Sequence, residues 1–241
     1  MNLKTTLIDV DDLAALPAAG VLVVDCRFDL ANPEGGAQAF RAGHIPGAVY
    51  ASLDRDLSDL TRQDQGLGRH PLPTITAFNR MLARWGWKRS VQVVAYDDHG
   101  GALAAARLWW LLRLAGVPSA VLDGGYAAWT QSGRHVETGD AAPRVGSVVE
   151  LVFDARQMLV DHTQLLDQGA QALLDARAAA RFRGDIEPLD RVGGHVPGAR
   201  NRPFADNLDM DGHFKSPRQL RDEFQAVLGA DAPQRVVHIW Q

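Results

Sequence analysis

An internal repeat constrains the fold of this chain more than any other feature of its sequence. Residues 25–27, Asp-Cys-Arg, recur 150 positions later as residues 175–177, Asp-Ala-Arg. Residues 44–48, His-Ile-Pro-Gly-Ala, recur 151 positions later as residues 195–199, His-Val-Pro-Gly-Ala. Motifs that return in the same order indicate a tandem duplication. The 241 residues are therefore expected to form two related domains rather than one large domain.

A strand followed by a loop and a helix is the best defined local pattern. Val91–Tyr96 is an apolar run typical of a buried strand, Asp97–Gly101 is polar, and Ala102–Leu114 is an alanine-rich helix. In the second copy the strand returns within Arg235–Gln241, where the given chain ends. We therefore expect the second domain to be incomplete, with Trp240 in the place of the first loop residue.

Strands alternate with helices along the chain, which favours an α/β fold with a parallel sheet covered on both faces. Thr74–Trp85 predicts one amphipathic helix, with Thr74 or Thr76 near its N-cap. Residues 133–147 hold three glycines and few apolar side chains, as expected of a linker. We predict a complete first domain over residues 1–140 and a truncated second domain over residues 150–241.

Composition and charge exclude several classes of protein. The net charge of −4 gives no indication of a nucleic-acid or anionic membrane partner. A single cysteine cannot form an internal disulfide, which fits a reducing compartment. No signal peptide is recognisable, and no apolar run approaches the ~20 residues of a membrane span. These observations predict a cytoplasmic protein.

The two histidines of the repeated motif do not form a metal site by spacing. His44 and His195 belong to separate copies, and neither has a second ligand two to four residues away. Proline and glycine next to them are typical of a turn. No metal and no cofactor are expected.

The repeated motifs resemble those of the tandem-domain rhodanese family of thiosulfate and 3-mercaptopyruvate sulfurtransferases. The resemblance rests on the Asp-x-Arg and His-(Ile/Val)-Pro-Gly-Ala pairs and on Tyr96-Asp97, residues 107–110 and residues 122–125. It covers nearly the whole chain. It implies two tandem domains, each a parallel five-stranded sheet between helices, with catalysis in the second domain only.

The resemblance also implies the chemistry. A cysteine thiolate takes a sulfane sulfur from the donor as a persulfide and passes it to a thiophilic acceptor such as cyanide. A free thiol has a pKa of ~8.5, so the thiolate needs stabilisation, which backbone N–H groups at a helix N-terminus supply. In the family that cysteine follows the strand that resembles Val236–Ile239. Trp240 occupies this position here, and we expect the chain as given to be inactive.

Four further residues match functional positions of the family. Arg181 and Arg191 match the arginines that bind the substrate carboxylate and carbonyl in the mercaptopyruvate branch, although both could be ordinary surface charges. Asp54 and His70 resemble the acid and the histidine of a triad proposed for that branch. Plain loop chemistry explains this second pair equally well.

Two residues of the first copy invite a catalytic role, but a structural role is favoured. Asp97 stands where an active first domain would carry a cysteine. A carboxylate there would satisfy the N–H groups that otherwise bind an anion, so it is expected to act as a filler. Cys26 is the only thiol and lies in the Asp-x-Arg motif, which favours a small buried residue at a strand end over a substitute sulfur acceptor.

Two alternatives to a sulfurtransferase remain open from sequence. One is a non-enzymatic rhodanese-like module that binds an anion or a partner at residues 98–101. The other is a structural role in which another chain covers the second domain, by self-association for example. For the sulfurtransferase, the only partners implied are a small sulfur donor and a small acceptor.

Overall fold

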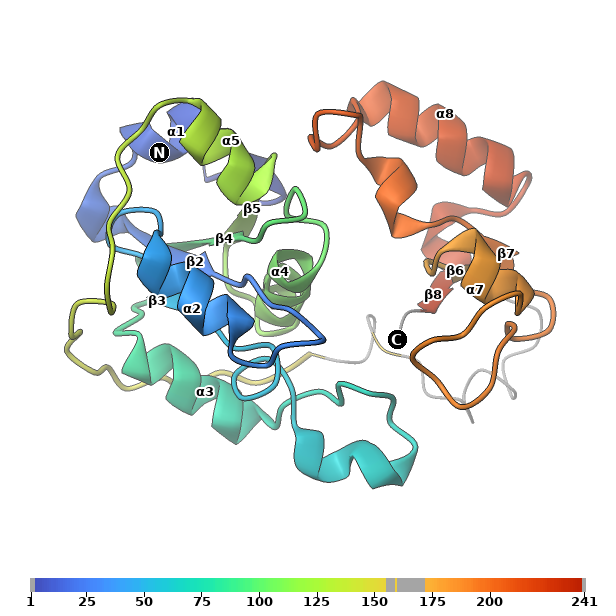
Figure 1. Ribbon diagram of the computed structural model, residues 1–241, viewed down its shortest axis with the longest axis horizontal. Helices are drawn as coiled ribbons and strands as arrows, with labels where there is room; N and C mark the ends of the chain where they lie inside the picture. Colours follow the sequence, from blue (N-terminus) through green and yellow to red (C-terminus); the bar gives the residue numbers. More distant parts are fainter. Residues whose placement is uncertain (1–2, 155–158, 160–171, 240–241) are drawn as a thin grey trace. The chain divides into compact units, whose positions relative to one another are not determined.

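The computed structural model describes residues 3–154, 159 and 172–239. The chain divides into two compact units, Met1–Ala155 and Arg156–Gln241, which are described separately (Figure 1). Val160 and Asp161, which match Val10 and Asp11 in the repeat, lie outside the described residues, as does Trp240. No helix in the described part of the chain is long and apolar enough to cross a membrane.

The first unit is built on a parallel sheet of five strands in the order β1-β5-β4-β2-β3. The strands are β1 (Leu7–Ile8), β2 (Val21–Asp25), β3 (Val49–Tyr50), β4 (Gln92–Tyr96) and β5 (Ser119–Leu122). Every residue of the central strand β4 is buried. A central strand without polar alternation is what a parallel sheet covered on both faces requires.

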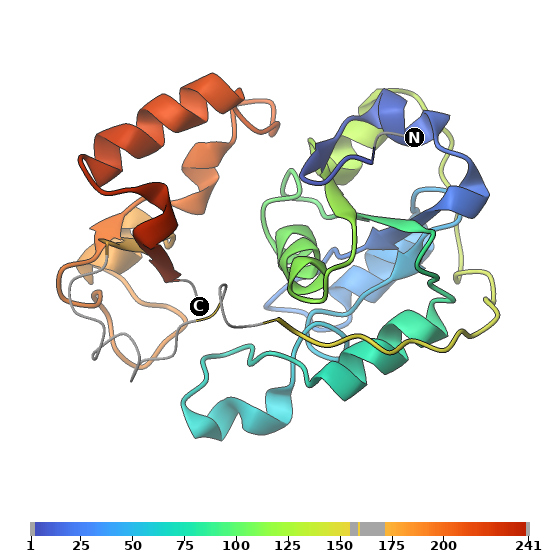
Figure 2. The same cartoon turned by 180° about the vertical axis from the view of Figure 1, so that it is seen from behind.

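Helices cover both faces of this sheet (Figures 1 and 2). They are α1 (Val10–Ala15), α2 (Gly35–Ala42), α3 (Ile75–Arg84), α4 (Ala104–Leu114) and α5 (Gly125–Gln131), with short 3-10 helices η1 (Ala18–Gly20) and η2 (Leu60–Gln65). Leu13, Phe40 and Trp129 place α1, α2 and α5 against one face, in a single core cluster with Val94 and Tyr96. The alternate strand residues face the other side, where α4 lies along β4 and β5.

Local sequence explains where several of these helices begin. The side chain of Thr74 accepts a hydrogen bond from the Ala77 N–H, and that of Asp9 accepts one from the Asp12 N–H. Both are N-caps, which hold backbone donors that the helix itself cannot pair. The predicted N-cap at Thr74 is confirmed, and the actual helices begin within two residues of the predicted ones.

Residues 137–154, called the connecting segment below, lie on the first unit. Ser147 donates from its N–H to the Ala83 carbonyl and from its hydroxyl to the Trp87 carbonyl, at 3.2 and 2.6 Å. Asn79 exchanges two hydrogen bonds with the Leu151 backbone, at 3.1 and 3.2 Å. The sequence suggests a linker over residues 133–147, but apolar side chains and backbone bonds fix this stretch to α3.

The second unit repeats the half of the first sheet that runs from β4 through β2 to β3. Its described strands, β6 (Ala172–Asp175), β7 (Arg200–Asn201) and β8 (Val236–Ile239), form a parallel sheet in the order β7-β6-β8. Its helices are α7 (Ala179–Arg183) and α8 (Pro217–Leu228), with 3-10 helices η3 (Phe204–Asn207) and η4 (Pro233–Arg235). α8 begins after Ser216, whose hydroxyl accepts from the Gln219 N–H, and has a proline in its first turn.

The strand register confirms the duplication. Asp25 lies opposite Tyr50 in β3 and Tyr96 in β4. Asp175 lies opposite Asn201 in β7 and Ile239 in β8. Ile239 therefore holds the position of Tyr96, as the sequence alignment predicts. The two strands differ in burial, because β4 is wholly buried whereas three of the four residues of β8 are half-buried and one is exposed.

Candidate functional site

An aspartate–arginine pair lies at the end of β2 in the first unit. The Asp25 carboxylate accepts from the Arg27 backbone N–H at 2.9 Å and from the guanidinium at 2.6–3.1 Å. The Arg27 Nη2 also donates to the Gly43 carbonyl at 2.6 Å. The Tyr96 hydroxyl donates to Asp25 at 2.8 Å. Both ions are buried, and these hydrogen bonds offset the cost of removing the charges from water.

The second unit reproduces this pair almost bond for bond. Asp175 accepts from the Arg177 N–H at 2.9 Å and from its guanidinium at 2.7–3.1 Å, and Arg177 donates to the Gly194 carbonyl at 2.6 Å. Ile239 has no hydroxyl to replace that of Tyr96. A carboxylate from the following loop, Glu187, lies 3.7 Å from Arg177 instead. The motif is therefore a structural element of each copy.

The histidines of the repeated turn are also structural. His44 stacks on Phe40 with ring centroids 3.9 Å apart, and its Nδ1 lies 2.9 Å from the Phe40 carbonyl. His195 stacks on Phe182 at 3.8 Å, with its Nδ1 2.7 Å from the Phe182 carbonyl. Within residues 3–154, 159 and 172–239, no group of three metal-ligating side chains comes together.

The loop after β4 is filled by its own aspartate. One oxygen of Asp97 accepts from the N–H groups of His99 and Gly101 at 2.9 and 2.8 Å, and the other accepts from Leu103 and Ala105 at 3.1 Å. Burial raises the pKa of the Asp97 carboxyl, and the four N–H donors act in the opposite direction. These are the donors that would otherwise bind an anion, so the filler role is confirmed.

Glycine is required at one point of this loop. Gly101 has φ = 88°, and a Cβ at this position would lie 2.2 Å from Cγ1 of Val121. Only glycine combines that backbone conformation with such a close approach to the neighbouring strand. The backbone can then curl around the Asp97 carboxylate and direct its N–H groups inward.

The only thiol of the chain is enclosed in the first core. Cys26 directly follows β2 and its side chain is fully buried. Burial raises the pKa of the thiol well above its ordinary value, and the neighbouring Asp25 and Asp97 raise it further. A thiol in this environment stays protonated at neutral pH and is a poor nucleophile. The expectation of a small buried residue is confirmed.

The structure brings Asp54 and His70 together. The His70 Nε2 lies 3.4 Å from the Asp54 Oδ1, with the histidine side chain 14% and the aspartate side chain 38% exposed. Burial and the nearby Arg107 lower the pKa of His70, although Asp54 acts to raise it. Arg107 also donates to the His70 carbonyl at 2.7 Å and to the Leu57 carbonyl at 2.9 Å, so it fixes the loop that carries the pair.

Arg181 is clamped by two carboxylates of the second unit. Its Nε lies 3.0 Å from the Glu187 Oε1, and its Nη2 lies 2.6 Å from the Asp190 Oδ2. Glu187 also accepts from the N–H groups of Leu189 and Asp190, each at 3.1 Å. Arg181 lowers the pKa of Glu187 through this hydrogen bond, against the effect of desolvation. The guanidinium is thus held in one orientation beside β6.

Arg191 follows this clamp in the chain and is exposed. It makes no ion pair with the parts of the chain that the structure describes. The two arginines remain candidates predicted from the sequence, which did not reveal the contacts of Arg181 with Glu187 and Asp190 or the role of Arg107. The acids at 187 and 190 lie six and nine residues after Arg181, a spacing without a helical or strand period, so only the folded loop brings them to it.

The sequence of this chain matches a known family of proteins. The model of the rhodanese-like domain matches residues 9–132. The chain is 44% identical over 230 residues to a probable 3-mercaptopyruvate sulfurtransferase of Pseudomonas aeruginosa, covering 92% of this chain and 79% of the relative. The chain belongs to the rhodanese family. The predicted family and α/β fold class are thereby confirmed.

Two further proteins of the family show the same likeness. A putative thiosulfate sulfurtransferase SseB of Mycobacterium tuberculosis is 44% identical over 213 residues, covering 86% of this chain and 74% of that protein. The solved 3-mercaptopyruvate sulfurtransferase of Leishmania major is 28% identical with a TM-score of 0.83. It covers 97% of this chain, whereas this chain spans only 65% of that protein.

Proposed function

We propose that this rhodanese-family chain serves sulfur transfer of the 3-mercaptopyruvate or thiosulfate type. The observation that carries the proposal is its 44% identity to a probable 3-mercaptopyruvate sulfurtransferase over 92% of the chain. The two copies of the Asp-x-Arg pair, held by matching hydrogen bonds, support the same conclusion from within the structure. The reducing cytoplasm is the proposed compartment for such a thiol-dependent reaction.

In the proposed reaction a thiolate attacks the sulfane sulfur of the donor, and the donor fragment leaves with the electron pair of the broken bond. The enzyme then carries a persulfide, and an acceptor such as cyanide attacks its outer sulfur and releases the thiolate. The 241-residue chain offers only Cys26 for this role, and that thiol is buried and protonated. We therefore propose that the chain as given binds donors without turning them over.

Donor binding is assigned to the exposed Arg191 and the clamped Arg181. A planar guanidinium pairs with a carboxylate through two parallel hydrogen bonds, which suits the carboxylate of 3-mercaptopyruvate. Glu187 and Asp190 already pair with Arg181, so a donor must compete for that guanidinium or share it. Weak binding that depends on Arg181 is the expected result.

Calorimetric titration of the whole chain with 3-mercaptopyruvate tests this assignment. Arg181→Gln should weaken binding at least fivefold. Arg183→Gln is the matched control, because Arg183 lies two residues away on the same helix and pairs with Asp185 in the open. Equal affinity of the wild-type and Arg181→Gln proteins would refute the role of Arg181, and so would equal losses for the two variants.

We further propose that the second unit associates with a second copy of itself. Four apolar side chains between β6 and β7 are 40–80% exposed: Ile186, Leu189, Val192 and Val196. β8 is also less buried than its counterpart β4. Exposed apolar side chains gathered in one loop favour association. Analytical ultracentrifugation should detect a dimer that Val192→Asp weakens, whereas a monomer at all concentrations would refute the proposal.

The alternative of an anion-binding module at residues 98–101 loses support. The N–H groups that would bind the anion already donate to Asp97. An external anion would have to displace a covalently tethered carboxylate from a buried position, which is unfavourable.

A further inference from the structure

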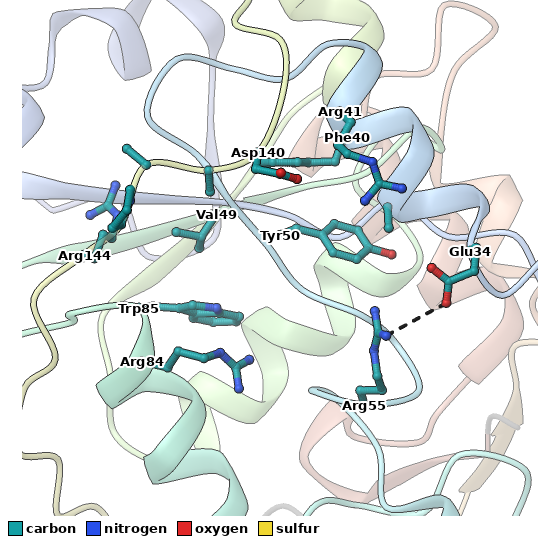
Figure 3. Close-up of a pocket in the computed structure, with 14 residues that line it drawn as sticks. Glu34, Phe40, Arg41, Val49, Tyr50, Arg55, Arg84, Trp85, Asp140 and Arg144 are labelled. Carbon is teal, nitrogen blue, oxygen red and sulfur yellow. Dashed lines mark ion pairs between the residues drawn. The ribbon is translucent and has the colours of Figure 1, made fainter.

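A second candidate binding site lies at the edge of the first sheet. β3 is the edge strand, and a pocket of about 550 Å³ opens beside it. Its walls come from α2, the end of α3 and the connecting segment, whose residues 140–144 line one side (Figure 3). The Asp97 loop follows the central strand β4, so this pocket is a different place in the fold.

The floor of the pocket is aromatic and apolar. Phe40, Val49 and Trp85 are 3–5% exposed. Tyr50 is half-buried, and its hydroxyl donates to the Arg27 carbonyl at 3.3 Å. Burial raises the pKa of Tyr50 to about 12, so the ring carries no charge at neutral pH. Figure 3 shows the rings of Tyr50 and Trp85 among the charged side chains.

The rim of the pocket is charged, with an excess of cations. It carries the side chains of Arg41, Arg55, Arg84, Arg144, Glu34 and Asp140. Four guanidinium groups against two carboxylates leave a net charge of +2 on the lining residues. The chain as a whole is negative, so this pocket departs from the average of the protein surface.

Three of these four guanidinium groups form no close ion pair with a carboxylate of the described residues. Arg41 is exposed and pairs with no carboxylate of the described residues. Arg55 lies 3.9 Å from Glu34, at a position where both side chains are more than 60% exposed. Arg144 donates to the carbonyl of Gly47 at 2.6 Å, which leaves its charge unneutralised. Exposed pairs of this kind contribute little stability and exchange readily.

Arg84 is the exception among the four. It pairs with Asp56, which lies outside the pocket, at 2.5 Å. Counting Asp56 with the lining residues still leaves the site with one more cation than anion. Arg84 therefore contributes less to any anion than Arg41 does, and Arg41 is the better residue to test.

We propose that this pocket binds a small organic anion with a flat apolar body, a function separate from sulfur transfer. Guanidinium groups recognise phosphate, sulfonate or carboxylate, and they also stack on planar groups. The aromatic floor takes the apolar body, and the volume lies within the range of small-molecule sites. Neither feature alone would select such a ligand, but their combination in one cavity does.

Phenyl phosphate is a suitable probe, because it combines an anionic phosphate with a flat apolar ring. Calorimetric titration of the whole chain should show phenyl phosphate binding at least tenfold more tightly than inorganic phosphate, and phenol not binding measurably. Equal affinity for phenyl phosphate and inorganic phosphate would reduce the site to a nonspecific patch of charge and overturn the proposal. Absence of binding by phenyl phosphate would overturn it as well.

Substitutions of charged residues test whether phenyl phosphate binds in this pocket. Arg41→Gln should weaken phenyl phosphate binding at least threefold, whereas Glu34→Gln should strengthen it, because removal of that carboxylate releases Arg55. Arg62→Gln, in η2 and outside the pocket, is the control and should leave binding unchanged. Circular dichroism melts confirm that each variant is folded. Equal effects of the two arginine variants, or weaker binding after Glu34→Gln, would contradict the proposed site.

Discussion

At the scale of single residues, Asp97 explains why the loop after β4 offers no open anion site. Its carboxylate takes four backbone N–H donors that would otherwise face a ligand. Sequence indicated this outcome because an acid at the start of a helix meets unpaired donors. The Asp97 carboxylate occupies the loop where an external anion would bind, and its hydrogen bonds stabilise the loop instead.

Replacement of Asp97 by alanine tests this role. Asp97→Ala leaves four backbone donors without an acceptor, and those of Gly101 and Ala105 are buried. Each buried unmade bond costs about 1–3 kcal/mol, so a loss of about 2–6 kcal/mol in unfolding free energy is expected. Urea denaturation measures it. Sulfate should restore part of the loss by entering the emptied loop, and should stabilise the variant more than the wild type. A variant as stable as the wild type would contradict the filler role.

The pKa values of His70 and His99 should be shifted in opposite directions from the ordinary value of a histidine. Burial and Arg107 lower the pKa of His70, whereas the 2.7 Å contact with Asp98 raises that of His99. NMR titration of the ring protons should place His70 below 6.5 and His99 above it. For His70 the unfolded state binds more protons, so its contribution to stability is present above pH 6.5 and is lost as pH falls toward the folded pKa.

A matched variant checks the His70 assignment. Asp54→Asn removes the carboxylate 3.4 Å from the ring and should lower the His70 pKa further, while that of His99 stays unchanged. A His70 pKa above 6.5 in the wild type would show that the Asp54 charge outweighs burial and Arg107.

At the scale of elements, the duplicated Asp-x-Arg pair should stabilise each unit independently. Arg27→Lys removes the forked contact with Asp25 and the bond to Gly43, and breaking a buried pair costs about 3–5 kcal/mol. Arg177→Lys removes the same contacts from the second unit. Five of the six tryptophans lie in residues 85–129. Urea denaturation followed by tryptophan fluorescence should therefore shift for Arg27→Lys and change little for Arg177→Lys. Equal shifts would mean that the two units unfold together.

The connecting segment should resist proteolysis. Its backbone is bonded to α3 and the loop after it at Ser147 and Leu151, and a bonded backbone does not enter a protease site. Limited trypsin digestion should leave a first-unit fragment that retains residues 144–151. Asn79→Ala should expose the segment to cleavage, whereas Gln38→Ala on the open face of α2 should not. A first cut at Arg144 in the wild type would contradict this attachment.

The elements that sequence predicted well share a local cause. The strand Val91–Tyr96, the N-cap at Thr74 and the filler role of Asp97 follow from neighbouring residues, and the duplication follows from repeated motifs. The linker was misplaced because composition does not reveal that Leu151 and Phe153 pack on Asn79 and Phe78. The clamp on Arg181 and the pocket beside β3 join residues from separate loops, which only the fold brings together.

At the scale of the whole molecule, the chain combines a well-packed first unit with a less buried second one. Of the buried apolar residues in the described chain, only Leu174 and Leu228 belong to the second unit. The single thiol of the chain, Cys26, directly follows β2 and is buried in the first unit. A rhodanese-family architecture is therefore present, and we propose that the buried Cys26 thiol takes no part in sulfur transfer.

A sulfur-transfer assay with intact-mass analysis tests this central claim most directly. The chain is incubated with thiosulfate or 3-mercaptopyruvate and cyanide, and thiocyanate is measured beside the Cys26→Ser variant. Both proteins should release no thiocyanate above buffer, and the wild type should gain no sulfur atom, because the buried Cys26 thiol stays protonated. Thiocyanate release that Cys26→Ser abolishes, together with a sulfur adduct on Cys26, would contradict the account.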